Sequence, residues 1–149
     1  MHAACVAVVL VTHDSEGFLE QTLASIDKQT QQADVRIAVD DLSSDASSDL
    51  LRDSSFSVAK ATSTSEDTIT RIAQNFLQGA RLASSAGADL VVLGDHDDVW
   101  HSDRIEHQSR LLRSNPQSAM VASDGYLIDQ HGAALPGTIR QTFPVPGNF

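Results

Sequence analysis

The amino-acid sequence predicts an α/β fold in which a mainly parallel sheet is flanked by helices. Short apolar runs alternate along the chain with stretches of helical period, and polar clusters follow three of the apolar runs. This alternation is typical of βαβ units, whose parallel strands are buried on both faces. At 149 residues, 41% of them hydrophobic, the chain is long enough for one domain around one core.

The first part of the chain begins with a strand expected over Cys5 to Thr12 (CVAVVLVT), because a continuous valine-rich run is typical of burial on both faces. Apolar side chains recur at helical spacing over 15–29, and a second strand is expected over Val35 to Val39. The polar loop that follows leads into a short helix, for which Ser44 or Asp45 supplies the N-cap.

The middle of the chain carries a weaker third strand over 56–61. A long amphipathic helix comes next, because apolar side chains recur at helical spacing from Asp67 to Gly87. A short strand follows over 90–93. Ser102 is expected to cap a helix that ends before Asn115-Pro116, since the residue before a proline disfavours helical geometry.

The last part of the chain is expected to contain a strand over Ala119 to Ser123 and an apolar-polar alternation over 126–129. A turn at Gln130-His131-Gly132 would make a hairpin. Residues 136–149 hold three prolines and two glycines. The predicted organisation is one domain over 1–135, followed by an irregular tail over 136–149.

Composition argues against several classes of partner. The formal net charge of -10 argues against nucleic acid or an anionic membrane surface, although a divalent cation can join an acidic protein to an anionic small molecule. Cys5 is the only cysteine, which excludes a disulfide within the chain and fits a reducing compartment. The longest apolar run, Ala3 to Val11, is too short to cross a bilayer. We expect a cytoplasmic protein, and we leave open an oligomer and a peripheral position at the inner face of the membrane.

Polar clusters follow the ends of three predicted strands. They are Thr12-His13-Asp14, Asp40-Asp41 and the segment from Asp95 to Asp98. The carboxyl ends of parallel strands meet at one edge of a sheet, where α/β proteins bind their ligands. We therefore expect the three clusters to form one site.

The segment Asp95-His96-Asp97-Asp98 places three carboxylates within four residues. Like charges repel and lose hydration, so such a cluster is expected where a counter-ion binds. Asp-X-Asp at a strand end suits Mg²⁺ or Mn²⁺, which bind one or two carboxylates together with substrate phosphates. Such a cation would neutralise a diphosphate leaving group. The alternative is that these residues are ordinary loop and capping acids.

Asp40-Asp41 supports a similar but weaker argument. A carboxylate at a strand end can accept the imide N–H of uracil or thymine, or a ribose hydroxyl, although a double aspartate in a turn is often only solvated. His13 could stack on a base. Arg71 is a nearby cation for phosphate, and its alternative is an exposed helical arginine.

Three stretches together resemble family 2 glycosyltransferases of the GT-A fold. They are VVLVTHDSEGFLEQTLASI, VDDLSSDASSDLL and NFLQGARLASSAGADLVVLGDHDDVWHSDRIEHQ, and the resemblance covers about residues 4 to 130. Asp-Asp-Val-Trp with Asp103-Arg104 just beyond is similar to members that build rhamnose-containing and other bacterial surface polysaccharides. The resemblance implies a Rossmann-like GT-A fold of which the chain holds the N-terminal, nucleotide-sugar-binding half.

The resemblance also implies roles for single residues. Asp97 would be the main ligand of Mn²⁺ or Mg²⁺, and Asp95 would reach the metal or the ribose. Asp41 would bind the pyrimidine imide, which favours a UDP- or dTDP-sugar, and Asp40 would support that loop. Together with neighbours in the same clusters, the implied nucleotide-sugar-binding residues are Thr12, His13, Asp14, Asp40, Asp41, Arg71, Asn75, Asp95 and His96.

Four positions depart from the family pattern. Val11 stands for the usual proline and His13 for the usual tyrosine, so base stacking is expected to differ. Leu42 and Ala46 stand where glycines are usual, so the backbone there is expected to avoid positive φ. The carboxylates are intact.

The acceptor side is where the chain falls short of the pattern. The resemblance implies inverting transfer to a hydroxyl of a saccharide or lipid-linked acceptor, with an Asp base several tens of positions beyond Phe149. Asp124 and Asp129 are late carboxylates for which we expect turn-stabilising roles. We expect the donor-binding part of a glycosyltransferase of bacterial surface-polysaccharide synthesis that transfers sugar poorly alone. The alternative is a non-catalytic nucleotide-sugar-binding module.

Two other classes that use clustered acids fit less well. A phosphatase of the haloacid dehalogenase type and a response-regulator receiver both need a lysine after the acids. Lys28 and Lys60 are the only lysines, and both precede the carboxylates of Asp95 to Asp98.

Overall fold

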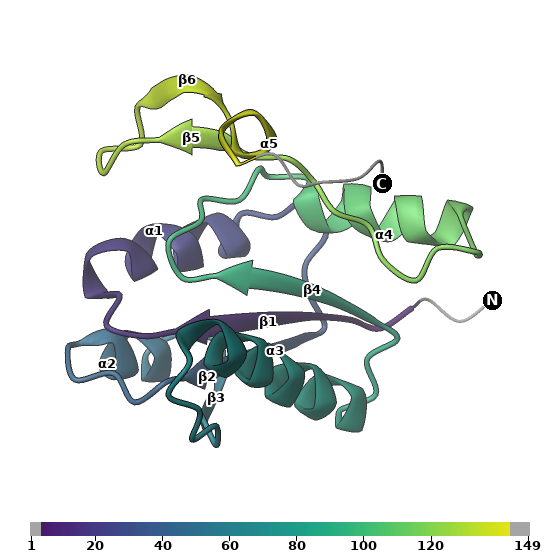
Figure 1. Cartoon of the computed structure of the whole chain (residues 1–149). Helices are drawn as coiled ribbons and strands as arrows, with labels where there is room; N and C mark the ends of the chain where they lie inside the picture. The colour runs from purple at the N-terminus through teal and green to yellow at the C-terminus, as the bar shows by residue number, and fades with distance from the viewer. Residues whose placement is uncertain (1–3, 144–149) are drawn as a thin grey trace. The chain divides into compact units, whose positions relative to one another are not determined.

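The computed structural model of the chain describes residues 4–143 and divides into two compact units, one ending at Ser109 and one beginning at Arg110. The first unit is built on a sheet in which all neighbouring strands are parallel (Figure 1). The α/β class and the four strands predicted in this unit are confirmed. In the order in which they lie side by side, the strands are β3 (Ser57–Lys60), β2 (Val35–Asp40), β1 (Val6–Thr12) and β4 (Leu90–Asp95).

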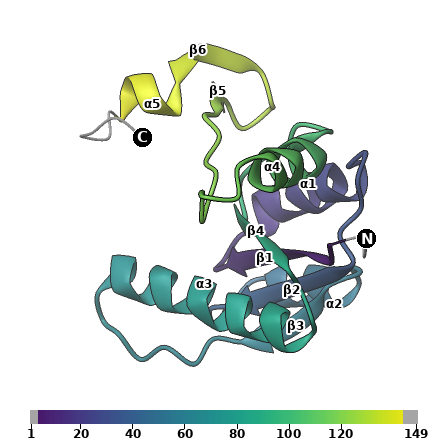
Figure 2. The same cartoon turned by 90° about the vertical axis from the view of Figure 1, so that its right-hand side faces the viewer.

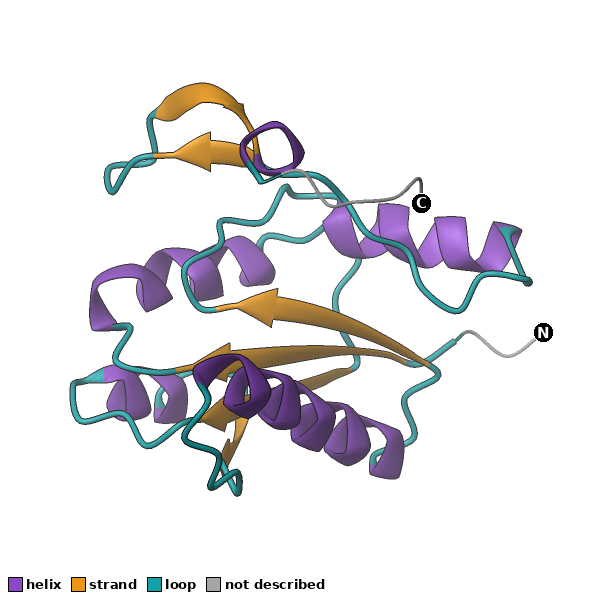
Figure 3. Cartoon of the chain, viewed as in Figure 1, coloured by secondary structure: helices purple, strands orange, loops and turns teal. Residues whose placement is uncertain are grey.

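Helices alternate with these strands along the chain (Figure 3). The last of them begins in the first unit and continues beyond Ser109. The helices are α1 (Glu16–Asp27), α2 (Ser47–Arg52), α3 (Thr68–Ser85) and α4 (Arg104–Ser114).

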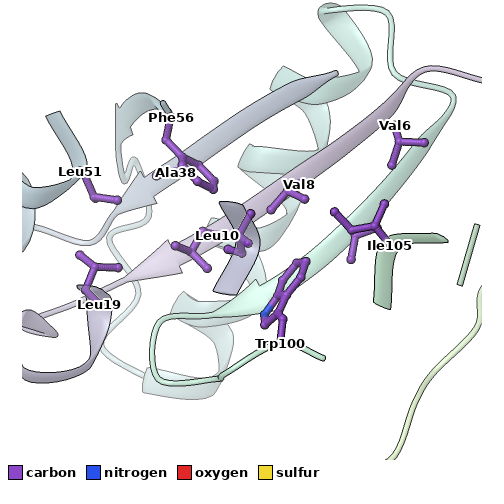
Figure 4. Close-up of a cluster of buried hydrophobic side chains, with 11 residues drawn as sticks. Val6, Val8, Leu10, Leu19, Ala38, Leu51, Phe56, Trp100 and Ile105 are labelled. Carbon is purple, nitrogen blue, oxygen red and sulfur yellow. The ribbon is translucent and has the colours of Figure 1, made fainter. Parts of the chain in front are cut away.

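The core of the first unit lies on both faces of β1, which explains why its apolar run is continuous. Alternate side chains of β1 enter different clusters, so α1 and α3 cover opposite faces of the sheet (Figure 2). The cluster on the α1 face contains Val6, Val8, Leu10, Leu19, Ile26, Leu51, Trp100 and Ile105 (Figure 4). The cluster on the α3 face contains Ala7, Val9, Val11, Ile37, Val39 and Ala83.

The long helix α3 forms where its periodicity predicts it, and Asp67 caps it by accepting a 2.8 Å hydrogen bond from the Thr70 amide. Its buried face differs from the apolar stripe. Gly79 lies so close to β1 that an added Cβ would be 2.3 Å from Val9 Cγ1. The close contact is therefore made by small residues, while Ile69 is 79% exposed. Within residues 4–143, no helix is both long and apolar enough to cross a membrane.

Two predicted helix caps are wrong. Helix α2 begins after Ala46, which has helical backbone angles, so neither Ser44 nor Asp45 is the N-cap residue. Asp45 still accepts a 2.9 Å hydrogen bond from the Ser47 amide. Helix α4 begins at Arg104, two residues after Ser102. In both places several neighbouring Ser and Asp side chains can accept from backbone amides, so the sequence alone leaves the cap ambiguous.

The second unit contains the predicted hairpin, formed by β5 (Tyr126–Ile128) and β6 (Ala134–Thr138), which pair antiparallel. The strand expected over 119–123 is wrong, since that stretch is irregular. The tail expected to be irregular from residue 136 instead completes β6 and forms the short helix α5 (Ile139–Thr142), whose start is a capping box between Thr138 and Gln141. Residues 144–149 lie outside the described part.

Of the two late carboxylates, Asp129 has the turn-stabilising role expected of it, whereas Asp124 joins the residues before β5 to α5. Asp129 Oδ1 accepts from the amides of His131 and Ala133, 2.8 and 2.9 Å away. Asp124 Oδ1 accepts from the amides of Gly125 and Arg140 at 2.9 and 3.0 Å.

Candidate functional site

The strand register brings the three polar clusters to one edge of the sheet. Thr12 pairs with Asp40 across β1 and β2, and Val11 pairs with Asp95 across β1 and β4. The arrowheads of β1 and β4 point to the same side in Figure 1. The carboxyl ends of these strands therefore form the edge at which α/β folds bind ligands.

Asp40 lies at the centre of a hydrogen-bond network beneath this edge and is almost fully buried. Its Oδ1 accepts from the hydroxyls of Thr12 and Ser43 at 3.2 and 2.6 Å, and its Oδ2 accepts from Ser48 Oγ at 2.9 Å. With these bonds made, the Asp40 carboxylate holds the loop after β2 in place. Thr12 is also fully buried, so its hydroxyl is turned to Asp40 rather than to the surface.

Asp41 and Arg71 form an ion pair just beyond the end of β2, where the Asp41 side chain is buried. Arg71 Nε donates to Asp41 Oδ2 across 2.8 Å, with the Arg71 side chain 28% exposed. Arg71 is therefore neither an isolated exposed arginine nor a cation without a partner. The pair presents carboxylate and guanidinium groups side by side.

His13 contacts the backbone of the same loop. Its Nδ1 lies 2.7 Å from the Asp41 carbonyl oxygen. A carbonyl can only accept, so Nδ1 carries a proton and Nε2 is the nitrogen left for other contacts. His13 Nε2 is 3.7 Å from Asp14 Oδ2.

The turns after β1 and β2 exchange hydrogen bonds, and we call the two segments 14–16 and 43–47 the paired turns. Asp14 Oδ1 accepts from the Ser44 amide at 2.7 Å, which holds the pKa of Asp14 below its ordinary value. In return the Asp14 amide donates to Ser43 Oγ at 3.0 Å. Glu16 Oε2 likewise accepts from the Ala46 amide at 3.0 Å. Asp14 thus braces the loop next to Asp41.

The backbone in and directly before the paired turns differs from one expectation. Leu42 has φ of 56°, and Asp14 has φ of 41°, so two residues other than glycine adopt the left-handed region. Leu42 was expected to avoid positive φ, which is wrong, whereas Ala46 at −72° agrees with the expectation. The hydrogen bonds of the paired turns fix the conformation that a glycine would otherwise favour.

The acidic segment, residues 95–98, begins at the last residue of β4 and is held by α1 and by Gln29 just beyond it. The His96 carbonyl accepts from Thr22 Oγ1 at 2.7 Å, and the Trp100 amide donates to Ser25 Oγ at 2.9 Å. Gln29 Nε2 donates to the His101 carbonyl at 2.7 Å. Sequence reasoning missed these three side chains. Their signal is that polar residues at 22, 25 and 29 keep helical spacing among the buried residues of α1 and just beyond its end.

Burial and mutual repulsion act on the carboxylates of the acidic segment. Burial raises the pKa of Asp95, and the charge of Asp97 raises it further. Burial also raises the pKa of Asp98, which the positive charge of Arg104 opposes. An added cation would relieve both the lost hydration and the repulsion.

The donor set fits a hard cation only in part. Among residues 4–143 no group of three or more His, Cys, Asp or Glu side chains could hold a metal ion. Asp95 and Asp97 offer carboxylate oxygens, which suit Mg²⁺ or Mn²⁺ when diphosphate and water supply the remaining ligands. The structure therefore fits a cation shared with a ligand.

Asn75 is, like Thr12, a predicted site residue that the structure does not bring to the surface. It lies one helical turn from Arg71, is 0% exposed, and has no hydrogen-bond partner for either side-chain polar atom within the described residues. Its carboxamide lies inside the contact between α3 and the sheet.

Comparison with known proteins identifies one family and one similar fold. The family model for glycosyl transferase family 2 matches residues 7–142. No curated protein matches the chain. S. aureus TarS 1-349 in complex with UDP has a TM-score of 0.58 at 17% identity, covering 74% of this chain and 32% of that one. S. aureus TarS 1-349 in complex with UDP-GlcNAc has a TM-score of 0.56 at 19% identity, and the match again covers 74% of this chain and 32% of that one.

At such identities the likeness shows the fold alone, and the chain spans about a third of the TarS 1-349 chain. Together with the family match, it confirms the Rossmann-like glycosyltransferase fold expected from the sequence.

Proposed function

We propose, because the chain belongs to glycosyl transferase family 2, that its first unit binds a nucleoside-diphosphate sugar at the carboxyl end of the sheet as the donor-binding part of a sugar transferase. The observation that carries the proposal is the register that brings the ends of β1, β2 and β4 to one edge. The TarS structures in complex with UDP and UDP-GlcNAc support a ligand of this class.

The ion pair of Asp41 and Arg71 is proposed to recognise the base. A uracil or thymine imide presents one N–H between two carbonyl oxygens. Asp41 can accept from that N–H, and Arg71, which uses Nε for Asp41, keeps further N–H groups for a carbonyl. This pattern favours UDP- or dTDP-sugars, because cytosine and the purines lack such an imide flanked on both sides.

Asp95 and Asp97 are proposed to hold Mn²⁺ or Mg²⁺ together with the diphosphate. When bound, the cation would supply positive charge that stabilises the leaving diphosphate. The contribution of the chain is to fix the acidic segment beforehand, through the bonds of α1 to the backbone at His96 and Trp100. A segment that is already ordered loses less conformational entropy on binding.

The acceptor is proposed to be a saccharide or lipid-linked hydroxyl in bacterial cell-surface polysaccharide synthesis, attacked with inversion. We propose no general base among residues 4–143, because the carboxylates of Asp124 and Asp129 accept hydrogen bonds from backbone amides. Binding without transfer by this chain would favour the non-catalytic module, whereas transfer to a defined acceptor would show that the chain supplies its own base.

Calorimetric titration of nucleoside diphosphates with and without Mn²⁺ tests the proposal. UDP or dTDP should bind more tightly with Mn²⁺ than without it, and ADP should bind weakly in both conditions. Asp97→Ala should lower the Mn²⁺-dependent affinity for UDP by about tenfold or more, because one of two protein ligands is lost.

Glu20→Ala is the matched control, since Glu20 is an exposed carboxylate on α1 outside the acidic segment. It should leave UDP affinity unchanged. Equal binding of UDP and ADP, or unchanged Mn²⁺ dependence in Asp97→Ala, would contradict the assignment.

A further inference from the structure

Three buried polar side chains, two on α1 and one just beyond its end, bind the main chain around the acidic segment. They are Thr22, Ser25 and Gln29, which we call the polar row. Within residues 4–143 each of them bonds to main-chain groups, and none bonds to a carboxylate of the acidic segment. Burying a polar side chain costs free energy unless it is hydrogen-bonded, so the row depends on these bonds.

Gln29 makes the largest number of these bonds. Its Nε2 donates to the His101 carbonyl at 2.7 Å and to the Ser25 carbonyl at 3.2 Å, and its Oε1 accepts from the Ile105 amide at 3.0 Å. Both hydrogens and the oxygen of the carboxamide are therefore in use. Ile105 is the second residue of α4, so its amide has no partner inside that helix. Gln29 thus caps α4 in the place of Ser102.

The polar row holds the main chain on both sides of Asp97. Before it, Thr22 Oγ1 donates to the His96 carbonyl at 2.7 Å, a shorter distance than the 3.4 Å to the Phe18 carbonyl of its own helix. After it, Gln29 holds the turn into α4. Asp97 therefore lies on a short loop with both ends bonded to the same helix and the residues that follow it.

Asp97 depends on these bonds more than Asp95 does. Within residues 4–143 neither carboxylate has a hydrogen bond or an ion pair, so the main chain sets where each carboxylate lies. Asp95 is the last residue of β4 and is fixed by its register with Val11 on β1. Asp97 lies beyond the sheet, so the bonds of the polar row take the place of strand pairing there.

Satisfying main-chain groups does not by itself account for a partner so far away in sequence. Ser102 and Asp103 directly precede α4 and have side chains of the kind that cap a helix from within the loop. Such local bonds would leave the loop free to shift relative to α1. Gln29 lies 76 residues from Ile105, so its bonds also fix where the loop lies in the fold.

We propose that the polar row positions Asp97 for the donor diphosphate and its cation: Thr22 and Gln29 hold the main chain on either side of Asp97 against α1, so that the carboxylate meets the ligand from a fixed backbone. This inference rests on the proposed function, since it supposes that a cation and a diphosphate bind at the acidic segment. Thr22 and Gln29 touch neither ligand and act through the main chain, so they are positioning residues.

The ratio of the UDP dissociation constant without Mn²⁺ to that with Mn²⁺ tests the inference, because it isolates the contribution of the cation. Thr22→Val keeps the shape of the side chain and removes the hydroxyl that binds the His96 carbonyl. We expect the ratio to fall about tenfold, the usual scale for losing a residue that orients a metal ligand, with little change in UDP affinity without Mn²⁺. Thr22→Ser keeps the hydroxyl and should retain most of the ratio.

Gln29→Met tests the other side of the loop, because it removes all three bonds of the carboxamide. It should also lower the ratio by about tenfold or more. Ile26→Val is the matched control. It removes a methyl group from a buried residue of α1 beside the polar row, so it lowers stability in urea without removing a bond to the acidic segment. Its ratio should equal that of the wild type.

An unchanged ratio in Thr22→Val, or in Gln29→Met that folds by circular dichroism, would overturn the inference. Equal losses in Thr22→Val and Thr22→Ser would overturn it as well. So would a parallel loss of UDP affinity with and without Mn²⁺, because the polar row would then support the whole site alike. If Gln29→Met does not fold, the two Thr22 variants decide.

The wild-type chain separates this inference from the proposed function. A wild-type ratio of one would overturn the proposed cation site and this inference together. A wild-type ratio well above one, combined with any of the failures above, would overturn this inference alone.

Discussion

At the scale of single residues, Leu42 is the clearest case of a conformation set by its neighbours. Its φ of 56° is unfavourable for a branched side chain, yet the residue is 67% exposed and has little packing to offset it. The turn holds it because Asp40 and Asp14 fix the loop on both sides. The strain falls directly beside Asp41, where a bound base is proposed.

Leu42→Gly should therefore stabilise the first unit by about 0.5–1 kcal/mol, since relief of the left-handed strain exceeds the added freedom of the unfolded chain. Urea denaturation followed by Trp100 fluorescence measures the change. Ala46→Gly is the matched control, because Ala46 has φ of −72°. It should destabilise by up to about 1 kcal/mol. A loss of stability in Leu42→Gly would contradict this account of the turn.

The site residues show which parts of a site can be predicted from sequence. The carboxylates at the strand ends were found because a buried strand followed by acids is unusual. Sequence reasoning did not find the roles of Thr22, Ser25 and Gln29, because these roles appear only when α1 is placed against the acidic segment. Asn75 shows the opposite case, in which a residue assigned to the ligand lies inside the protein.

At the scale of elements, α3 shows that periodicity predicts a helix better than it predicts the side that is buried. Ile69, Leu77 and other large apolar residues of α3 are exposed, and the closest contact with β1 is made through Gly79, with Ala83 and Phe76 packed in the same cluster. Close approach of helix and sheet requires small side chains, and hydrophobicity does not report size. The strands of the parallel sheet were predictable because burial on both faces leaves a continuous apolar run.

Gly79→Ala should destabilise the first unit by about 1–3 kcal/mol, because its Cβ would overlap Val9 on β1 and this outweighs the better helix propensity of alanine. Gly17→Ala provides the comparison within α1, since no atom lies within 4 Å of the added Cβ there. It should leave stability unchanged or raise it by up to about 1 kcal/mol. Similar effects of both substitutions in thermal unfolding would show that α3 does not pack as closely as described.

At the scale of the whole molecule, two groups of aspartates contribute to stability with opposite dependence on pH. Hydrogen bonds from Ser44, Ser47 and Thr70 hold the pKa values of Asp14, Asp45 and Asp67 below the ordinary 3.8. The unfolded chain then binds more protons in acid than the native chain does. The stability that these groups provide is complete above pH 3.8 and is lost as the pH falls through their lower native pKa values.

The stability contributed by the acidic segment changes with pH in the opposite direction. Burial raises the pKa values of Asp95 and Asp98, so the native state is favoured while they are protonated and loses this contribution as the pH rises through those raised values. Urea denaturation at several pH values should show a loss of stability below pH 3.8 and a smaller decline above it. In Asp98→Asn the upper decline should shrink while the acid loss stays. Increasing stability on acidification below pH 3.8 would contradict the assignment.

The organisation of the molecule was predicted only for the part built from parallel strands. The stretch 119–123 has strand-like composition but no described strand beside it, and residues 136–142 form an element through the capping box of Thr138 rather than through an apolar pattern. A strand forms only when another strand pairs with it, and the local sequence does not predict that neighbouring strand. The boundary between the units inside α4 has no composition signal of its own.

The paired turns have a consequence for how this sequence can change. They join positions about thirty residues apart through backbone amides as well as side chains. Each hydrogen bond therefore depends on the number of residues in the turn, which decides which amide faces which side chain. Inserting or deleting one residue in either turn would misalign several partners at once, while exchanging Ser, Thr or Asn would not. Related sequences should therefore keep the lengths of these two turns even where their residues differ.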